Sequence, residues 1–181
     1  MNNTQQTLHP YLALAKRAIT YAAKNRQPYK ATKEDLNTIK GNAKPLFVSI
    51  KKHGTLRGCM GTLEAIKPSL GAMIAYCASM AAIDDPRFMP ISEDELDALT
   101  ISIDIVNPFE IVEDTAMLDP QIYGILVTSY DKQGLLLPAL KGIDSIEQQL
   151  RIALEKAGIH HDESFTIKRF TVTRYHETNL D

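Results

Sequence analysis

The residues best suited to chemistry lie together in one short segment, HGTLRGCMGTLE, at positions 53–64. Cys59 supplies a sulfur that could attack a substrate or bind a metal, and Arg57 lies two residues before it. Alternate side chains of a regular strand lie on one face, so this spacing predicts that the guanidinium and the thiol are neighbours. A neighbouring positive charge stabilises the thiolate, the reactive form of cysteine. The segment therefore predicts an activated Cys59, with Arg57 stabilising the thiolate or a bound anion.

Two glycines and two ionisable residues complete this segment. Gly58 and Gly61 flank the thiol, and without a Cβ they let a ligand or another backbone come close. His53 and Glu64 are the base and the carboxylate that a thiol nucleophile needs, provided that folding brings them to Cys59. Each also has an ordinary interpretation, as a solvated turn histidine and a surface carboxylate. The thiol has one too, because free cysteine is among the most buried residue types.

A second charged group lies at positions 84–88, in the sequence DDPRF. Pro86 biases Asp85 away from helix, which indicates a turn that leaves Asp85 and Arg87 close together. We expect folding to bring both side chains to the thiol, where they would bind a small polar or acidic substrate. The alternative is a local ion pair that holds a loop, of the kind that adds little stability at a surface.

The strands that must position these residues follow from runs of apolar and β-branched side chains. A two-residue turn, His53-Gly54, joins two such runs and predicts a hairpin that presents Cys59. In the last run the apolar parity shifts between Ile167 and Phe170, which predicts a bulge or a change of sheet partner. The expected extended segments are 46–64, 99–105, 110–112, 124–130 with 135–137 around a Gly-closed loop, and 165–176.

Helices are predicted where apolar residues recur every three or four positions. Cys77 lies on the apolar stripe of one of them, so we interpret it as a core residue. The expected helices cover residues 10–25, 68–82 and 144–158, with short ones after the capping residues Thr32 and Ser92.

The composition excludes several classes of protein. With 20 Lys and Arg against 22 Asp and Glu in 181 residues, the net charge is −2, so we expect neither nucleic acid nor a membrane as partner. Two cysteines give no secreted disulfide framework, and the N-terminus lacks a leader pattern, so a cytoplasmic protein is expected. Paired metal-ligand spacings and nucleotide-binding glycine motifs are absent from the sequence, so we expect no metal and no cofactor.

The chain resembles the AMMECR domain family from about Tyr11 to Tyr175. Its LRGC-x-G element is the specific part of the resemblance. Met60 departs mildly from the isoleucine usual in the family, and Ala139 stands where a glutamine is common, so no role of that glutamine is carried over. The motifs that carry the resemblance are LFVSIKKHGTLRGCMGTLE at 46–64, DDPRF at 84–88, GLLLP at 134–138 and RF at 169–170.

The resemblance implies a fold and a setting rather than a reaction. The implied fold is α+β: a compact domain of two unequal lobes with a mostly antiparallel or mixed sheet flanked by helices, and LRGC-x-G in a cleft between the lobes. We expect a disordered N-terminus over 1–9 and a single domain over 10–178. The family supplies one component of the AmmeMemoRadiSam group, which implies Memo-like and radical SAM proteins as partners.

Two classes of function remain open from the sequence. In the first, Cys59 activated by Arg57 performs thiol-dependent chemistry on a small polar substrate. In the second, a non-catalytic binding or adaptor domain uses the same region to hold a ligand or a partner protein, and Cys59 is only a packing residue. The reactivity of the thiol distinguishes them.

Overall fold

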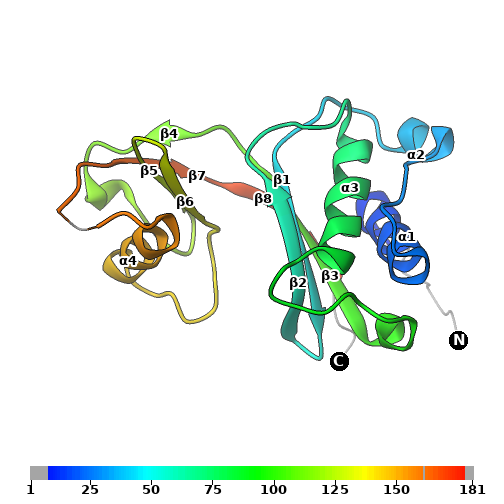
Figure 1. The fold of residues 1–181 in the computed structure, drawn as a ribbon. Coiled ribbons are helices and arrows are strands. Elements are labelled where there is room, and N and C mark those ends of the chain that lie inside the picture. The colour runs from blue at the N-terminus through cyan, green and yellow to red at the C-terminus, as the bar shows by residue number, and fades with distance from the viewer. Residues whose placement is uncertain (1–7, 161, 178–181) are drawn as a thin grey trace, which may run out of the picture. The chain divides into compact units, whose positions relative to one another are not determined.

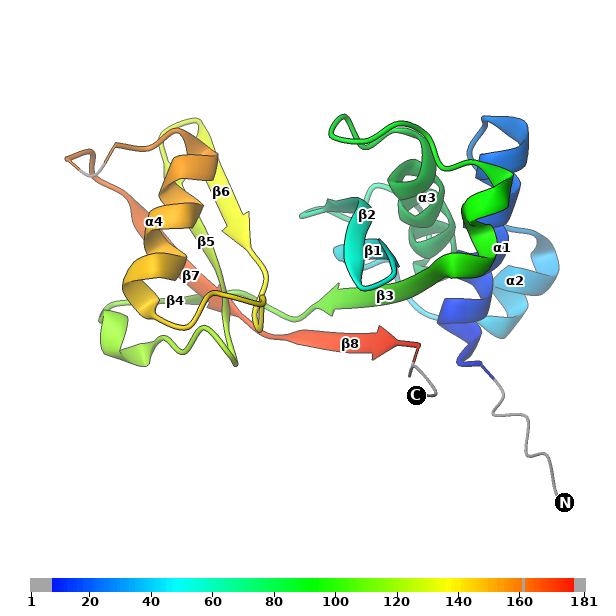
Figure 2. The ribbon, with the colours of Figure 1, turned by 90° about the horizontal axis from the view of Figure 1, so that it is seen from below.

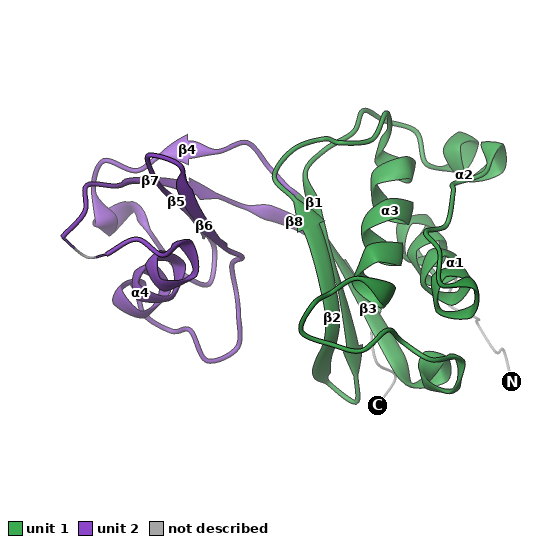
Figure 3. Cartoon of the chain, in the orientation of Figure 1, with its two compact units in different colours: residues 1–105, 174–181 green, residues 106–173 purple. Residues whose placement is uncertain are grey.

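The computed structural model describes residues 8–160 and 162–177, and its fold is α+β, as predicted (Figure 1). The chain forms two units, each with a sheet and at least one helix (Figure 3). Unit 1 runs to Ile105 and resumes at Arg174, and unit 2 is the segment between, Val106 to Thr173. The expected N-terminal segment 1–9 lies outside the described residues except for its last two. The single domain over 10–178 stays a prediction.

Unit 1 combines a sheet with helices that begin and end at recognisable capping residues. Pro10 occupies the first turn of α1, and Ser69 caps α3 through the N–H of Ala72. At 16 residues α1 is too short to span a bilayer, and no helix among the described residues is long and apolar enough to do so. The helices of unit 1 are α1 (Pro10–Asn25), α2 (Lys33–Thr38), α3 (Leu70–Ile83) and the 3-10 helix η1 (Glu93–Ala98).

The sheet of unit 1 has the strand order β2-β1-β3-β8. Its strands are β1 (Leu46–Lys52), β2 (Thr55–Thr62), β3 (Leu99–Val106) and β8 (Val172–His176). One face is apolar: Val48, Ile50 and Ile103 are fully buried. The residues between them lie on the opposite face, where Ser49 pairs with Ser102.

Helix α3 is the middle layer of unit 1, between α1 and the strands β1 and β2 (Figure 2). Ten of its 14 residues are buried, since it has a neighbour on both sides. Cys77 is fully buried among them, as predicted.

Unit 2 has a second sheet, with the order β4-β7-β5-β6, and a helix packed against β5 and β6. The sequence places this helix one residue early, because Ser145 rather than Asp144 is the N-cap. The Gly-closed loop is also wrong: Tyr130 and Asp131 alone form the turn, and Gly134 lies within a strand. The elements are β4 (Glu110–Ile111), η2 (Thr115–Met117), β5 (Gly124–Ser129), β6 (Lys132–Leu136), α4 (Ile146–Ala157) and β7 (Thr166–Phe170).

The predicted change of sheet partner near the C-terminus is confirmed. Strand β7 lies between β4 and β5 in the second sheet, whereas β8, which starts two residues after Phe170, lies beside β3 in the first. The change comes just after Phe170, since β7 pairs with β5 in an unbroken register from Thr166 to Phe170.

Candidate functional site

The β1–β2 hairpin contains a bulge at Arg57. Leu56 pairs with Lys51, but the next pair is Gly58 with Ile50, so Arg57 has no partner in β1. An extra residue of this kind breaks the alternation of side chains along a strand and can redirect them.

The bulge decides which face of the sheet Cys59 occupies. An unbroken register would place Arg57 opposite Ile50 and Cys59 opposite Val48, both buried in the core. In the bulged register Cys59 instead pairs with Ser49, on the face that points away from the helices. The prediction that Arg57 and Cys59 are neighbours on a regular strand is therefore wrong, because the strand is not regular between them.

The guanidinium of Arg57 binds Glu95 and a main-chain carbonyl. Its Nε and Nη2 donate to the two carboxylate oxygens of Glu95 at 2.9 and 2.8 Å, and its Nη1 donates to the carbonyl of Met89 at 2.8 Å. Lys52 adds a third donor to Glu95, at 3.0 Å. The hydrogen bonds from Arg57 are the main reason that the pKa of Glu95 lies well below its usual range. Arg57 is thus a structural cation in this arrangement.

The Cys59 thiol is partly buried and faces a serine. The Ser49 hydroxyl donates to Sγ at 3.4 Å. Burial raises the pKa of Cys59, and this effect outweighs the hydrogen bond from Ser49 and the positive charge of Arg87, which both lower it. The thiol is therefore neutral at neutral pH, and the cation that acts on it is Arg87 instead of Arg57.

Asp85 binds the strand that carries the thiol. Its Oδ2 accepts the main-chain N–H of Cys59 at 2.8 Å and Nη2 of Arg87 at 2.7 Å, and its Oδ1 accepts Nε of Arg87 at 2.9 Å. The hydrogen bonds from Arg87 are the main cause that lowers the pKa of Asp85 to about 2. Because β2 is an edge strand, this N–H has no neighbouring strand to bind. Folding does bring Asp85 and Arg87 to Cys59, but Asp85 contacts its backbone.

These contacts fasten residues 84–95 to β2, and we call this segment the clamped loop. Asp85 binds the main chain of the strand, while Met89 and Glu95 both bind the side chain of Arg57. The local ion pair that the sequence left as an alternative is therefore present, and it is one of several anchors.

Gly58 and Gly61 permit close packing within the protein. A Cβ on Gly58 would lie 2.2 Å from the carbonyl oxygen of Ala81 in α3, and one on Gly61 would lie 2.2 Å from the ring of Phe47. The space that we expected a ligand to use is occupied by a helix backbone and an aromatic ring.

His53 and Glu64 lie away from the thiol. His53 is exposed in the hairpin turn, with a φ of 49°, and Glu64 is exposed beyond the end of β2. At the rise of a β-strand, the three residues from Cys59 to Thr62 already span roughly 10 Å. Neither side chain is placed to act as base or orienting group for Cys59.

Two residues of the site were not predicted from the sequence. Ser49 could have been found only by counting pairs outward from the His53-Gly54 turn with the bulge included. Glu95 was expected only as the capping partner of Ser92, a contact that it does make, at 3.1 Å from the Ser92 N–H.

The contacts around Cys59 favour the neutral thiol over the thiolate. Asp85, a carboxylate close enough to influence the thiol, is already held by an N–H and by a guanidinium. Across the described ranges, no group of three or more His, Cys, Asp or Glu side chains is placed to hold a metal ion. The cleft implied between the lobes stays a prediction.

Comparisons with known proteins match the chain to a family. The AMMECR1 family profile matches residues 12–180. A protein of Thermotoga maritima is 44% identical over 92% of this chain and 97% of its own length, and one of Clostridium acetobutylicum is 38% identical over 96% of this chain but only 37% of its own length. The crystal structure of an uncharacterized protein from Pyrococcus horikoshii is similar with a TM-score of 0.81 at 27% identity, covering 92% of this chain and 89% of that chain.

Proposed function

Since the chain belongs to the AMMECR1 family, we propose that it is a non-catalytic binding domain of a multi-protein system, in which the clamped loop contacts the partner and Cys59 only packs. The family resemblance nominates Memo-like and radical SAM proteins as the partners. A protein of this kind needs a defined surface, and the loop beside β2 provides one.

The observation that carries the proposal is a loop fixed at several points that still exposes binding groups. Met89 is 81% exposed although its carbonyl is held by Arg57, and the side chain of Arg87 is 57% exposed although it binds Asp85. The Arg87 guanidinium also lies over the ring of Phe88, 5.4 Å from its centroid. Methionine and arginine are enriched at protein interfaces, and a loop that is already ordered loses less entropy when it binds.

Thiol-dependent chemistry on a small polar substrate is the competing function. It would need a thiolate at neutral pH, whereas burial raises the pKa of Cys59. The positive charge of Arg87 favours the thiolate only weakly, because the same guanidinium binds the negative carboxylate of Asp85 through two hydrogen bonds.

The test is a binding titration of this chain against the Memo-like and radical SAM proteins of the same genome. We expect Met89→Asp to weaken binding about tenfold or more, since a charge would be buried at the interface. Cys59→Ala should bind as tightly as the original chain and keep the activity of the assembled system.

Ile111→Asp is the matched control, because Ile111 is 69% exposed and lies in unit 2, outside the clamped loop. Loss of the activity of the assembled system in Cys59→Ala, with unchanged binding in Met89→Asp, would reverse the choice between the two functions. Absence of binding to both proteins would remove the multi-protein part of the proposal.

A further inference from the structure

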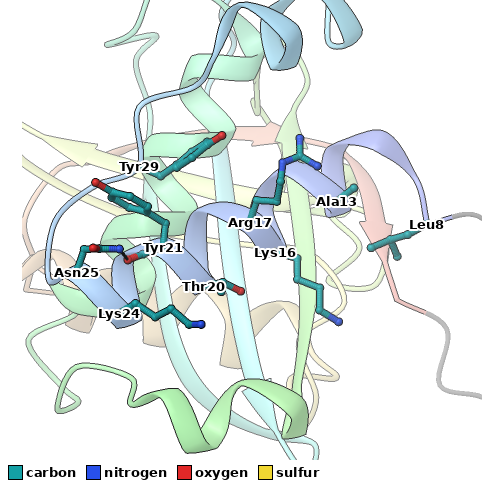
Figure 4. Close-up of a pocket in the computed structure, with 9 residues that line it drawn as sticks. All are labelled: Leu8, Ala13, Lys16, Arg17, Thr20, Tyr21, Lys24, Asn25 and Tyr29. Atoms are coloured by element: carbon teal, nitrogen blue, oxygen red, sulfur yellow. Dashed lines mark hydrogen bonds between the residues drawn. The ribbon is translucent and has the colours of Figure 1, made fainter.

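The outward side of α1 carries an open hollow of about 500 Å³ (Figure 4). Its lining is mainly apolar. Leu8 lies at one end of the hollow and Tyr29 at the other, with the helix between them (Figure 4). The α1 residues that line it are Ala13, Lys16, Arg17, Thr20, Tyr21, Lys24 and Asn25.

The spacing of these residues forms a stripe along one face of the helix. They recur at three- and four-residue intervals, and the opposite stripe, which includes Leu12, Ile19 and Ala23, is buried in the core. Ala13 and Thr20 have short side chains and lie seven residues apart, so the helix surface is recessed at both positions. Low positions at this spacing accept side chains from a second helix that packs alongside.

The hollow has a positive rim. Lys16, Arg17 and Lys24 line it, and no carboxylate among the residues that the structure describes does. Helix α1 contains no acidic residue, although the chain as a whole carries −2. Arg17 is paired with Asp35 but keeps 52% of its side chain exposed. Lys24 is 3.7 Å from Glu93, and both side chains are more than half exposed, so this pair is weak.

Two tyrosines at one end provide a rigid aromatic anchor. Tyr21 and Tyr29 meet edge to face, with ring centroids 5.5 Å apart, and Tyr21 is 39% exposed. The Tyr29 hydroxyl donates to Asp35 at 2.8 Å, and the main-chain N–H of Tyr29 donates to the Ser79 hydroxyl at 2.9 Å. Tyrosine residues held in place in this way frequently dominate the energy of an interface.

From this shape and charge we infer that the α1 face binds an acidic amphipathic α-helix of a partner protein. The apolar side of that helix would lie over Ala13 and Thr20, and its carboxylates would meet Lys16 and Lys24, which is the helix-in-groove mode of recognition. The inference does not depend on the role proposed for the clamped loop, whose one contact with the residues used here is the weak pair of Glu93 with Lys24.

The test uses a labelled synthetic helix about three heptads long, with leucine on one face and glutamate on both flanks. In fluorescence anisotropy with the full chain, we expect this peptide to bind at least about tenfold more tightly than one with the same leucines and lysine flanks. The double substitution Lys16→Glu/Lys24→Glu should lower its affinity about tenfold and reduce the salt dependence. Thr20→Trp should abolish binding by filling the hollow.

The double substitution Lys40→Glu/Lys44→Glu is the control, since it changes the net charge equally at exposed lysines outside the hollow. If Thr20→Trp lowers the melting temperature, its loss of binding could come from misfolding. The two double lysine variants then test the inference without it. Equal affinity for the two peptides, no binding of the glutamate peptide, or binding unchanged by Lys16→Glu/Lys24→Glu would overturn the inference. Dimerisation of the chain that Thr20→Trp removes, without peptide binding, would assign the hollow to a second copy.

Discussion

The chemical character of Cys59 is set by its immediate neighbours. The residue is partly buried, faces the Ser49 hydroxyl, and lies close enough to Arg87 and Asp85 to sense both charges. The net result is a raised pKa of the thiol. Burial destabilises the thiolate more than the Ser49 hydrogen bond and the charge of Arg87 stabilise it.

Alkylation of Cys59 in the folded protein should therefore be slow at neutral pH and rise only at a pH above the ordinary pKa of a cysteine, because burial raises the pKa of this thiol. Arg87→Gln removes the cation that lowers this pKa, so its profile should move to still higher pH. Mass spectrometry of iodoacetamide-treated protein measures the rate for each cysteine.

Cys77 is the internal reference: it is fully buried and burial raises its pKa to about 12, so it should stay unmodified until the protein unfolds. Rapid modification of Cys59 at mildly acidic pH would restore the thiol-enzyme hypothesis.

Gly58 is a position where one added methyl group should lower stability. Gly58→Ala places a Cβ against the carbonyl oxygen of Ala81, a main-chain atom of α3 that cannot rotate away. We expect the free energy of unfolding to fall by about 1–3 kcal/mol, the usual cost of overpacking. Urea denaturation measures it.

Gly71→Ala is the matched control for that substitution. Its nearest neighbour is the end of the Leu36 side chain at 3.2 Å, which can shift, and alanine favours the helix. The free energy of unfolding should stay the same or rise. A similar fall in the free energy of unfolding in both variants would show that the contact with α3 is not the reason that position 58 requires glycine.

At the scale of elements, the clamped loop protects the edge of the first sheet. Asp85 occupies the N–H that an added strand would otherwise bind, so the loop hinders pairing of β2 with another chain. Asp85→Ala should leave the Cys59 amide without its acceptor and release one anchor of the loop. The amide should then exchange its hydrogen faster, and the protein should lose about 1–3 kcal/mol of stability.

Asp84→Ala gives the comparison, because Asp84 is the adjacent carboxylate but is exposed. Hydrogen exchange followed by NMR at Cys59 and along residues 84–95 distinguishes the two variants. Equal protection of the Cys59 amide in both would mean that Asp85 does not hold the strand.

Elements with a strong periodic signal could be predicted from the sequence, and the register between them could not. Helix α1 and the β1–β2 hairpin were predicted within a residue or two, because capping residues and a two-residue turn mark their ends. The bulge at Arg57 leaves no mark in the sequence, and Glu95, which binds the guanidinium of the bulged residue, lies 38 residues further along the chain. The extra residue pairs Cys59 with Ser49, on the face opposite to the one that an unbroken register would give it.

At the scale of the molecule, ion pairs with a stabilised carboxylate are concentrated in unit 1. Burial raises the pKa of Asp35, but hydrogen bonds from Thr32, Tyr29 and Arg17 outweigh it and hold the pKa at about 2. Asp85 and Glu95, described above, belong to the same unit. In unit 2, the described carboxyl group with a lowered pKa is Glu163, which is partly exposed and bound to Lys132.

This distribution predicts acid sensitivity that begins in unit 1. A carboxyl group whose pKa is lower in the folded than in the unfolded chain stabilises the fold above the unfolded pKa of about 4, and that contribution is lost as the pH falls toward the folded pKa of about 2. The melting temperature should therefore fall between about pH 4 and pH 2. Methyl NMR signals of Ile103 in unit 1 should lose their native shifts before those of Ile125 in unit 2.

Glu95→Gln separates this effect from the general repulsion of a positively charged chain at low pH. The variant lacks the charge that Arg57 and Lys52 stabilise, so it should be less stable at pH 6 and should lose less on acidification. Glu64→Gln removes the same charge at an exposed position and should follow the original chain at every pH. If Glu95→Gln loses as much stability as the original chain between pH 4 and pH 2, the contacts of Glu95 do not govern acid unfolding. Protonation of the Glu95 carboxylate would then have no effect on the stability of the original chain.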